Sequence, residues 1–151
     1  MLKFIQGLLN LNVLLASKVR ATTAYGEALE YHRAKDYEKA LPLMVEAAEL
    51  GNTQAMSVLG SMYLLGQGVT EDGQLAVKWL QNAIDGGFDG AVSVLGMAYA
   101  SGKAGVKIDI PKAREMLSFA AKRGEEQSAR MLAMMDNGEG MFSSQKRGKR
   151  R

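Results

Sequence analysis

The sequence predicts an all-α protein: an α-solenoid of about three helical hairpins, with one helix before them and a capping helix after them. Two observations support this fold class. A set of small and apolar residues recurs at a spacing of 36 residues, and within each copy the apolar residues follow one face of a helix. A period of this length is typical of stacked repeats, because a single hairpin cannot bury its apolar face alone.

Residues 2–19 are predicted to form the first helix, with polar and apolar side chains on different sides. The polar residues fall within an arc of roughly 60° at 100° per residue, and the large apolar residues lie opposite. The polar set is Lys3, Gln6, Asn10 and Ser17, and the apolar set is Phe4, Leu8, Leu11, Leu15 and Val19. This pattern favours a retained helix that caps the solenoid or binds a partner. A cleaved secretory signal is the first alternative, and a membrane-surface helix, which would want more Lys and Arg, is the second.

The repeats follow, and they are clearest in the middle of the chain. Residues 55–66 recur 36 residues later, and from residue 69 onward the spacing becomes 37, which predicts one inserted residue in the loop 101–105. An earlier unit precedes these two, with a spacing of 34 residues in its first half because its internal loop is shorter. The matched residues are Ala55, Leu59, Gly60, Tyr63 and Gly66, which correspond to Ala91, Leu95, Gly96, Tyr99 and Gly102.

Each unit is predicted to contain two helices. Gly66 ends the first helix of the unit 55–87, because glycine readily adopts the left-handed conformation that terminates helices. Asp72 lies near the start of the second helix, where an acidic side chain favours the positive end of the helix dipole. In the next unit Pro111 begins the second helix, since its fixed φ suits a first turn. Gly60 allows the neighbouring helix to approach closely.

The segments 55–69 and 91–102 resemble Sel1-like repeats, which are longer-looped relatives of tetratricopeptide repeats. The segment 36–52 resembles their second helix and exit turn, and the resemblance extends over roughly residues 22–136. One subgroup of the family has paired cysteines in each repeat, and this chain contains none. The domain organisation that follows is an N-terminal helix at 1–21, a solenoid at 22–136 and a tail at 137–151.

Composition disfavours an enzyme. The 151 residues include no Cys and a single His, His32, so most metal sites and acid–base constellations lack their residues. We expect no catalytic residue, no metal and no cofactor. His32 is interpreted as a surface or loop residue. The glycine loops are interpreted as helix ends, because they recur with the repeat and lack the Lys-Ser/Thr of a phosphate-binding loop.

The net charge of +3 comes from the end of the chain. Five of the 19 basic residues lie in the last six positions, and without them 14 basic residues face 16 acidic ones, which gives −2. The tail 137–151 is expected to be disordered when free. A solubilising end is favoured over a weak anionic partner, although nucleic acid and anionic lipid remain alternatives.

The family resemblance implies a non-catalytic scaffold or adaptor that binds another protein on its concave face. The runner-up is a bacterial immunity protein that neutralises a cognate toxin by direct binding. A cytoplasmic location is expected, or a periplasmic one if the N-terminus is a cleaved signal.

The predicted contact residues lie on the first helix of each unit, in positions not used for stacking, and run from acidic through apolar to basic. An extended or helical partner segment with matching order is expected to fit this groove. The partner-binding residues are Thr23, Glu27, Glu30, Tyr31, Ser57, Ser61, Leu64, Ser93, Met97, Arg130 and Met134.

Overall fold

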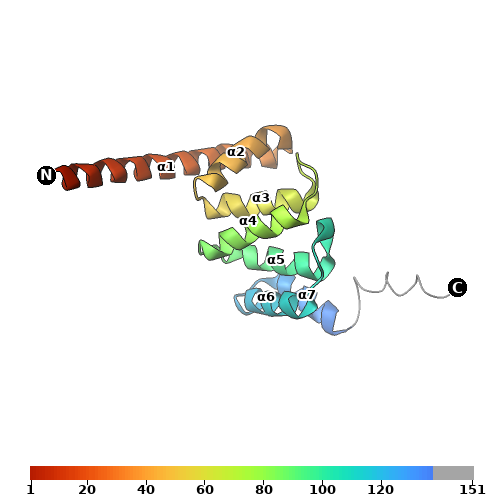
Figure 1. Ribbon diagram of the computed structural model, residues 1–151. Coiled ribbons are helices and arrows are strands. Elements are labelled where there is room, and N and C mark those ends of the chain that lie inside the picture. Colours follow the sequence, from red (N-terminus) through yellow and green to blue (C-terminus); the bar gives the residue numbers. More distant parts are fainter. Residues whose placement is uncertain (138–151) are drawn as a thin grey trace.

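A computed structural model describes residues 1–137, and within this range the chain forms seven α-helices and one short 3₁₀ turn, with no strand (Figure 1). The all-α fold class is therefore confirmed. The elements are α1 (Leu2–Arg33), α2 (Tyr37–Glu49), α3 (Thr53–Leu65), α4 (Gly73–Asp85), α5 (Gly90–Ser101), η1 (Lys103–Gly105), α6 (Ile110–Lys122) and α7 (Glu126–Asp136).

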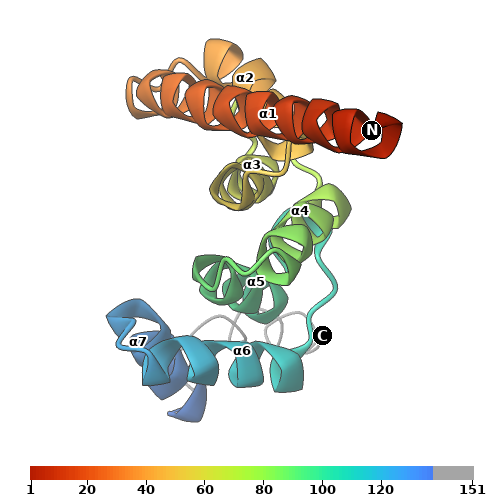
Figure 2. The same ribbon diagram turned by 90° about the vertical axis from the view of Figure 1, so that its left-hand side faces the viewer.

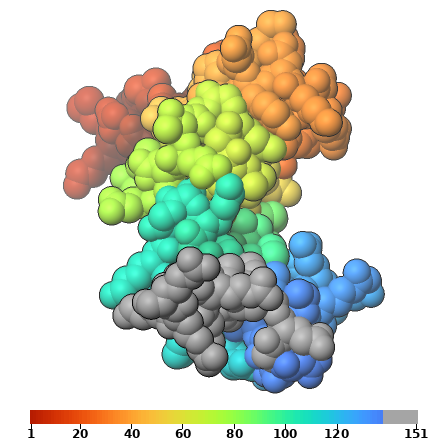
Figure 3. Space-filling view, turned by 90° about the vertical axis from the view of Figure 1, so that its right-hand side faces the viewer, coloured from red at the N-terminus to blue at the C-terminus, as the bar shows by residue number. Residues whose placement is uncertain are grey.

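The helices pair into hairpins that stack in chain order. The hairpins are α1–α2, α3–α4 and α5–α6, and the second helix of each packs on the first helix of the next, so that α7 covers α6. Figure 1 shows the stack, and in the space-filling view of Figure 3 the successive segments follow one another from top to bottom. The predicted solenoid and its final helix are both present in this arrangement.

Close contact between the two helices of a hairpin depends on small residues. A Cβ atom on Gly60 of α3 would lie 2.7 Å from Cγ of Leu80 in α4 and 3.1 Å from the carbonyl oxygen of Ala76. The matching Gly96 of α5 faces Leu117 of α6 in the same way, at 3.1 Å. A larger residue at either position would push the helices apart, which explains why glycine recurs there.

The helices end and begin as the sequence predicts. Gly66, the C-cap of α3, adopts the left-handed conformation with φ +64°. The carboxylate of Asp72 accepts hydrogen bonds from the N–H groups of Gln74 and Leu75, both at 2.9 Å, and so caps α4. Asp109 caps α6 through the N–H of Lys112 at 3.0 Å. These caps fix where each hairpin turns.

The loop with the predicted extra residue contains η1. Its central residue, Ala104, has φ +55°, a conformation that L-residues other than glycine adopt at a cost. The loop returns the chain to the hairpin, where Val106 is buried and the N–H of Asp109 donates to the carbonyl oxygen of Tyr99 at 3.1 Å. The insertion is thus accommodated outside the helices, and the stacking period is preserved.

The N-terminal helix differs from its predicted form in extent and in packing. Residues 2–19 are not a separate helix but the first part of α1, which continues without a break to Arg33. Only Ala21, Ala24 and Ala28 of α1 are buried, and up to residue 20 every residue is exposed except the half-buried Ser17. Residues 2–19 do not cap the solenoid, because this segment projects beyond the stacked helices, and the alternative that they bind a partner stays a prediction (Figures 1 and 3).

The predicted tail, residues 137–151, lies outside the described residues except for Asn137. Within the described part of the chain, every helix is too short or too polar to span a lipid bilayer.

Candidate partner-binding groove

The first helices of the hairpins share one side of the stack. In Figure 2, α3 and α5 lie to the left of α4, and α7 lies to the left of α6, so that α3, α5 and α7 follow one another along one side of the stack. This arrangement follows from the uniform hairpin length, because equal units place equivalent helices next to one another. It leaves one continuous face to which α3, α5 and α7 all contribute.

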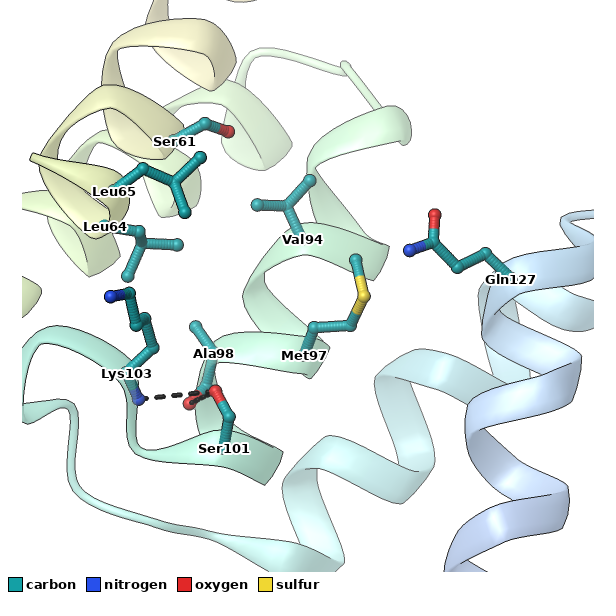
Figure 4. A pocket seen from close by; sticks show the side chains of 9 residues that line it. All are labelled: Ser61, Leu64, Leu65, Val94, Met97, Ala98, Ser101, Lys103 and Gln127. Carbon is teal, nitrogen blue, oxygen red and sulfur yellow. Dashed lines mark hydrogen bonds between the residues drawn. The ribbon is translucent and has the colours of Figure 1, made fainter. Parts of the chain in front are cut away.

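A pocket of about 390 Å³ lies on this face, between α3 and α5 (Figure 4). The loop that contains η1 closes one end, and α7 contributes a side chain at the other. Apolar side chains form most of its wall. The lining residues are Ser61, Leu64, Leu65, Val94, Met97, Ala98, Ser101, Lys103 and Gln127.

Helix α3 supplies one wall of the pocket. Ser61, Leu64 and Leu65 are three and four residues apart, so that they lie on one face of the helix. Leu64 is buried and forms part of the floor, whereas Leu65 is 55% exposed. The hydroxyl of Ser61 donates to the carbonyl oxygen of Ser57 at 3.1 Å, so its donor is already satisfied within the helix. The wall therefore offers mainly apolar contact.

Helix α5 supplies the opposite wall through the stripe Val94, Met97, Ala98 and Ser101. The small Ala98 leaves space at the base, and Met97 extends along the side of the pocket (Figure 4). A thioether side chain adapts its shape to different neighbours more readily than a branched one. The pocket thus combines a fixed floor with one flexible apolar side chain.

Polar groups stand at the two ends. Lys103 Nζ pairs with Glu71 Oε1 at 2.8 Å, and the N–H of Lys103 donates to Ser101 Oγ at 3.3 Å (Figure 4). Gln127 of α7 points toward Met97 from the other end (Figure 4). The Lys103–Glu71 pair is close to half exposed on both sides, so it contributes little to stability and leaves both groups available to a ligand.

Of the eleven predicted contact residues, three line the pocket: Ser61, Leu64 and Met97. Ser57, Leu64 and Ser93 are buried, so the prediction that these three point outward is wrong, although Leu64 still reaches the pocket floor. Neighbouring helices approach closely enough to cover such short or inward side chains. The hydroxyl of Ser93 donates to the carbonyl oxygen of Gly90 at 3.3 Å instead of facing solvent.

The remaining predicted residues lie on α1 and α7, away from the pocket. Thr23, Glu27 and Glu30 are exposed on α1, and Tyr31 is half-buried with the ammonium of Lys39 5.5 Å from its ring centroid. Arg130 and Met134 are exposed on α7.

The expected change from acidic to basic charge along the groove is weakened by local pairing. Glu30 pairs with Arg33 at 2.7 Å, and Arg130 pairs with Glu126 one turn earlier on the same helix. The groove is therefore apolar in its middle and close to balanced at its ends.

Six pocket residues escaped the sequence prediction: Leu65, Val94, Ala98, Ser101, Lys103 and Gln127. Two of these residues could have been predicted from their spacing. Val94 and Ser101 lie three residues before and four residues after Met97 and so share its helix face. Lys103 and Gln127 had no such signal, since their proximity depends on how the loop and α7 fold back.

Within the described residues, no group of three or more His, Asp or Glu side chains is placed to hold a metal ion. His32 lies in the last turn of α1, half-buried, where Nε2 donates to Gln67 Oε1 at 3.0 Å. Gln67 Nε2 in turn donates to Tyr37 Oη at 3.3 Å. This chain of hydrogen bonds joins the first hairpin to the α3–α4 loop, which is a structural role.

Comparison with known proteins identifies the repeat family that these hairpins match. A model of the Sel1 repeat matches the chain three times, at residues 21–52, 53–88 and 91–125. The first match begins at Ala21, the first buried residue of α1. An uncharacterized protein of Neisseria meningitidis serogroup B is 47% identical over 55 residues. That alignment covers 34% of this chain and 12% of the relative, so the chain spans only a small part of it.

Solved structures share the fold. A Sel1 repeat protein from Oxalobacter formigenes is 28% identical with a TM-score of 0.63, over 82% of this chain and 97% of that one. A protective antigen of uropathogenic Escherichia coli is 32% identical with a TM-score of 0.64, over 72% of this chain and 24% of that one. Cysteine rich protein B of Helicobacter pylori, at 24% identity and a TM-score of 0.53, shares the fold over 62% of this chain and 70% of its own.

Proposed function

The chain belongs to the Sel1 repeat family, whose members generally mediate protein–protein interactions, and we propose that the face formed by α3, α5 and α7 binds a segment of another protein. Members of this family are typically non-enzymatic scaffolds. Binding without catalysis is part of the proposal.

The pocket between α3 and α5 is the observation that supports the proposal. It is open to solvent, about 390 Å³ in volume, and lined mainly by apolar side chains on the face that the hairpins leave free. Leu65 and Met97 project into it from opposite helices (Figure 4). Apolar pockets of this kind hold the anchor residues that dominate the free energy of binding in protein interfaces.

The lining residues also indicate what the partner presents. An apolar side chain on a helix or an extended segment would fill the space between Leu65 and Met97. Polar groups next to that anchor would meet Ser101, Lys103 and Gln127 at the ends of the pocket. The flexible Met97 suits a family of related segments better than one rigid shape.

A peptide selection tests the proposal and requires no named partner. The complete chain is used to select from a random library of linear peptides, and the affinity of enriched peptides is measured by fluorescence anisotropy. We expect peptides with a large apolar residue in common. The variant Ser61→Arg with Met97→Arg fills the pocket with charged side chains and should weaken these peptides by at least about tenfold.

The matched control introduces two arginines on the second helix of a hairpin instead. Leu75→Arg with Asn82→Arg alters exposed residues of α4, away from the pocket, and should leave the affinity unchanged. Both variants must first give the same helical circular dichroism as the native chain. If no peptide is enriched, or if the two variants bind the enriched peptides equally well, the groove is not the binding site.

A further inference from the structure

Most of the large apolar side chains that are exposed in the described chain lie in the first part of α1. Of the sixteen large hydrophobic residues that are exposed in the described chain, eleven lie in residues 1–19. Figure 1 shows this segment extending away from the stacked hairpins. An apolar surface of this extent on a folded protein is typical of a binding surface, and the groove between α3 and α5 does not include it.

The apolar face of the projecting segment points away from the solenoid. The polar residues Lys3, Gln6, Asn10 and Ser17 lie on a helical stripe that continues, at spacings of four, three and four, into the alanines that pack on α2. The alanines are Ala21, Ala24 and Ala28. The polar stripe is therefore on the side of the hairpins.

The opposite stripe faces open solvent. Its residues are between 47% and 72% exposed, and it continues into Thr22 and Gly26, which are also exposed. They are Phe4, Leu8, Leu11, Leu15 and Val19. Asn12 is the polar exception on this side. Val13 and Leu14 border the polar stripe, and the exposed Leu2, Ile5 and Leu9 lie between the two stripes. A flat apolar surface can approach this face without meeting the solenoid.

The charges of residues 1–26 indicate the charge of the surface that this segment binds. The first 26 residues contain no Asp or Glu, and their charged side chains are Lys3, Lys18 and Arg20. Arg20 pairs with Glu46 of α2 at 2.6 Å, whereas Lys3 and Lys18 have no ion pair within the described residues. A second copy of the helix would bring only further positive charge. An anionic surface is complementary.

We propose that residues 2–19 of α1 lie in the surface of a lipid bilayer that carries anionic headgroups, with the solenoid held on the water side. The leucine-rich face enters the boundary between headgroups and acyl chains, and Lys18, at the edge of this face, approaches the phosphates. The helix lies flat because Gln6 and Asn10 then stay hydrated. Most of the free energy of binding comes from apolar burial, so few lysines suffice. The proposal is independent of the groove.

Vesicle flotation with the complete chain tests the proposal. The vesicles are phosphatidylcholine alone or an equal mixture of phosphatidylcholine and phosphatidylglycerol, and flotation separates bound protein from aggregates, which sediment. We expect the native chain to float with both kinds of vesicle. The anionic lipid should strengthen binding on the order of tenfold, and high salt should remove that gain.

Two triple variants localise the binding face, and both introduce alanine so that helix propensity is kept. Leu8→Ala, Leu11→Ala and Leu15→Ala should weaken vesicle binding roughly a hundredfold. Gln6→Ala, Asn10→Ala and Ser17→Ala, the control on the polar stripe, should bind at least as well as the native chain. Equal helical circular dichroism of the two variants, measured without lipid, makes the comparison valid.

Two results would overturn the proposal. The first is that the native chain fails to float; if it then sediments as a dimer that the leucine substitutions dissociate, this face is a self-association surface. The second is that both triple variants bind vesicles equally. Peptides that bind the groove should bind the leucine variant with native affinity, so the outcome does not depend on the proposed function.

Discussion

One part of helix α1 packs on α2 and the other projects into solvent. In this helix small alanines are buried, whereas larger and more hydrophobic leucines are exposed. In the part that packs on α2, the buried residues are alanines: Ala21, Ala24 and Ala28. In the projecting part, residues 2–20, leucines and a phenylalanine are exposed. The difference shows that burial along α1 depends on the presence of a neighbouring helix, and that the close approach of α1 and α2 is made by small residues. Large apolar residues without a neighbouring helix are left for an external surface.

The largest expected effect on the free energy of unfolding comes from replacing a buried leucine with alanine. Leu59 of α3 is fully buried, so Leu59→Ala should lower the free energy of unfolding by about 2–5 kcal/mol, because contacts are lost and a cavity remains. Leu8→Ala removes the same atoms from an exposed position and should change it by less than about 0.5 kcal/mol. Urea unfolding followed by circular dichroism measures both. Similar losses would mean that residues 2–20 belong to the folded core.

A smaller effect is expected from glycine substitutions within helices. Gly60→Ala places a methyl group 2.7 Å from Leu80 Cγ and should cost about 1–3 kcal/mol of stability. Gly7 lies in the projecting part with no atom within 4 Å of an added Cβ, so Gly7→Ala should raise helicity and favour the helix by about 0.5–1 kcal/mol. The sign of the two effects is the discriminating measurement. A stabilising Gly60→Ala would contradict the close contact of α3 and α4.

The smallest effect concerns the ion pair where α1 leaves the solenoid. Arg20 donates a hydrogen bond to Glu46 of α2 and holds the pKa of that carboxyl below its usual value of 4.5. Because the folded-state pKa is lowered, the pair contributes at neutral pH and its contribution is lost as the pH falls below about 4.5. Exposure makes the contribution small.

Hydrogen exchange of the amides near residue 20, measured across this pH range, detects that loss. Glu46→Gln should exchange faster than the native chain at neutral pH and show a weaker change on acidification. Asp36, whose pKa is lowered by its hydrogen bond from Lys39, titrates nearby and remains in both proteins. An unchanged pH dependence in Glu46→Gln would assign the effect to Asp36 or another group.

The repeat architecture could be predicted from the sequence because its signals are local or periodic. Gly66 and Gly102 each mark a helix end, which is a local signal. The 36-residue spacing aligns residues that have equivalent neighbours in every unit. The insertion between Ser101 and Gly105 was equally visible, because the spacing changes there by one residue. Stacking then follows from the need to bury the apolar face of each hairpin.

The candidate site was predicted only in part, because exposure within a helix face depends on the neighbouring helix. Ser57 and Ser61 are one turn apart on α3, yet Ser57 is buried and Ser61 reaches the pocket. Lys103 and Gln127 join the pocket through chain segments that are far apart in the sequence. The sequence prediction misses the continuity of α1, although nothing in the sequence between residues 19 and 22 ends a helix, because it places a helix boundary at the start of the first repeat.

Because the hairpins pack on one another in chain order, a protein of this kind can change its length by whole repeats. Among the described residues, each hairpin packs mainly on the hairpins before and after it in the chain. The α2–α3 and α4–α5 junctions correspond through the repeat, since Gly51 and Ala55 match Gly87 and Ala91. Duplication of one unit in the middle of the chain would therefore meet compatible surfaces on both sides and extend the inner wall by a fixed step. A gene that gains or loses such a unit changes the reach of its product while every remaining interface is kept.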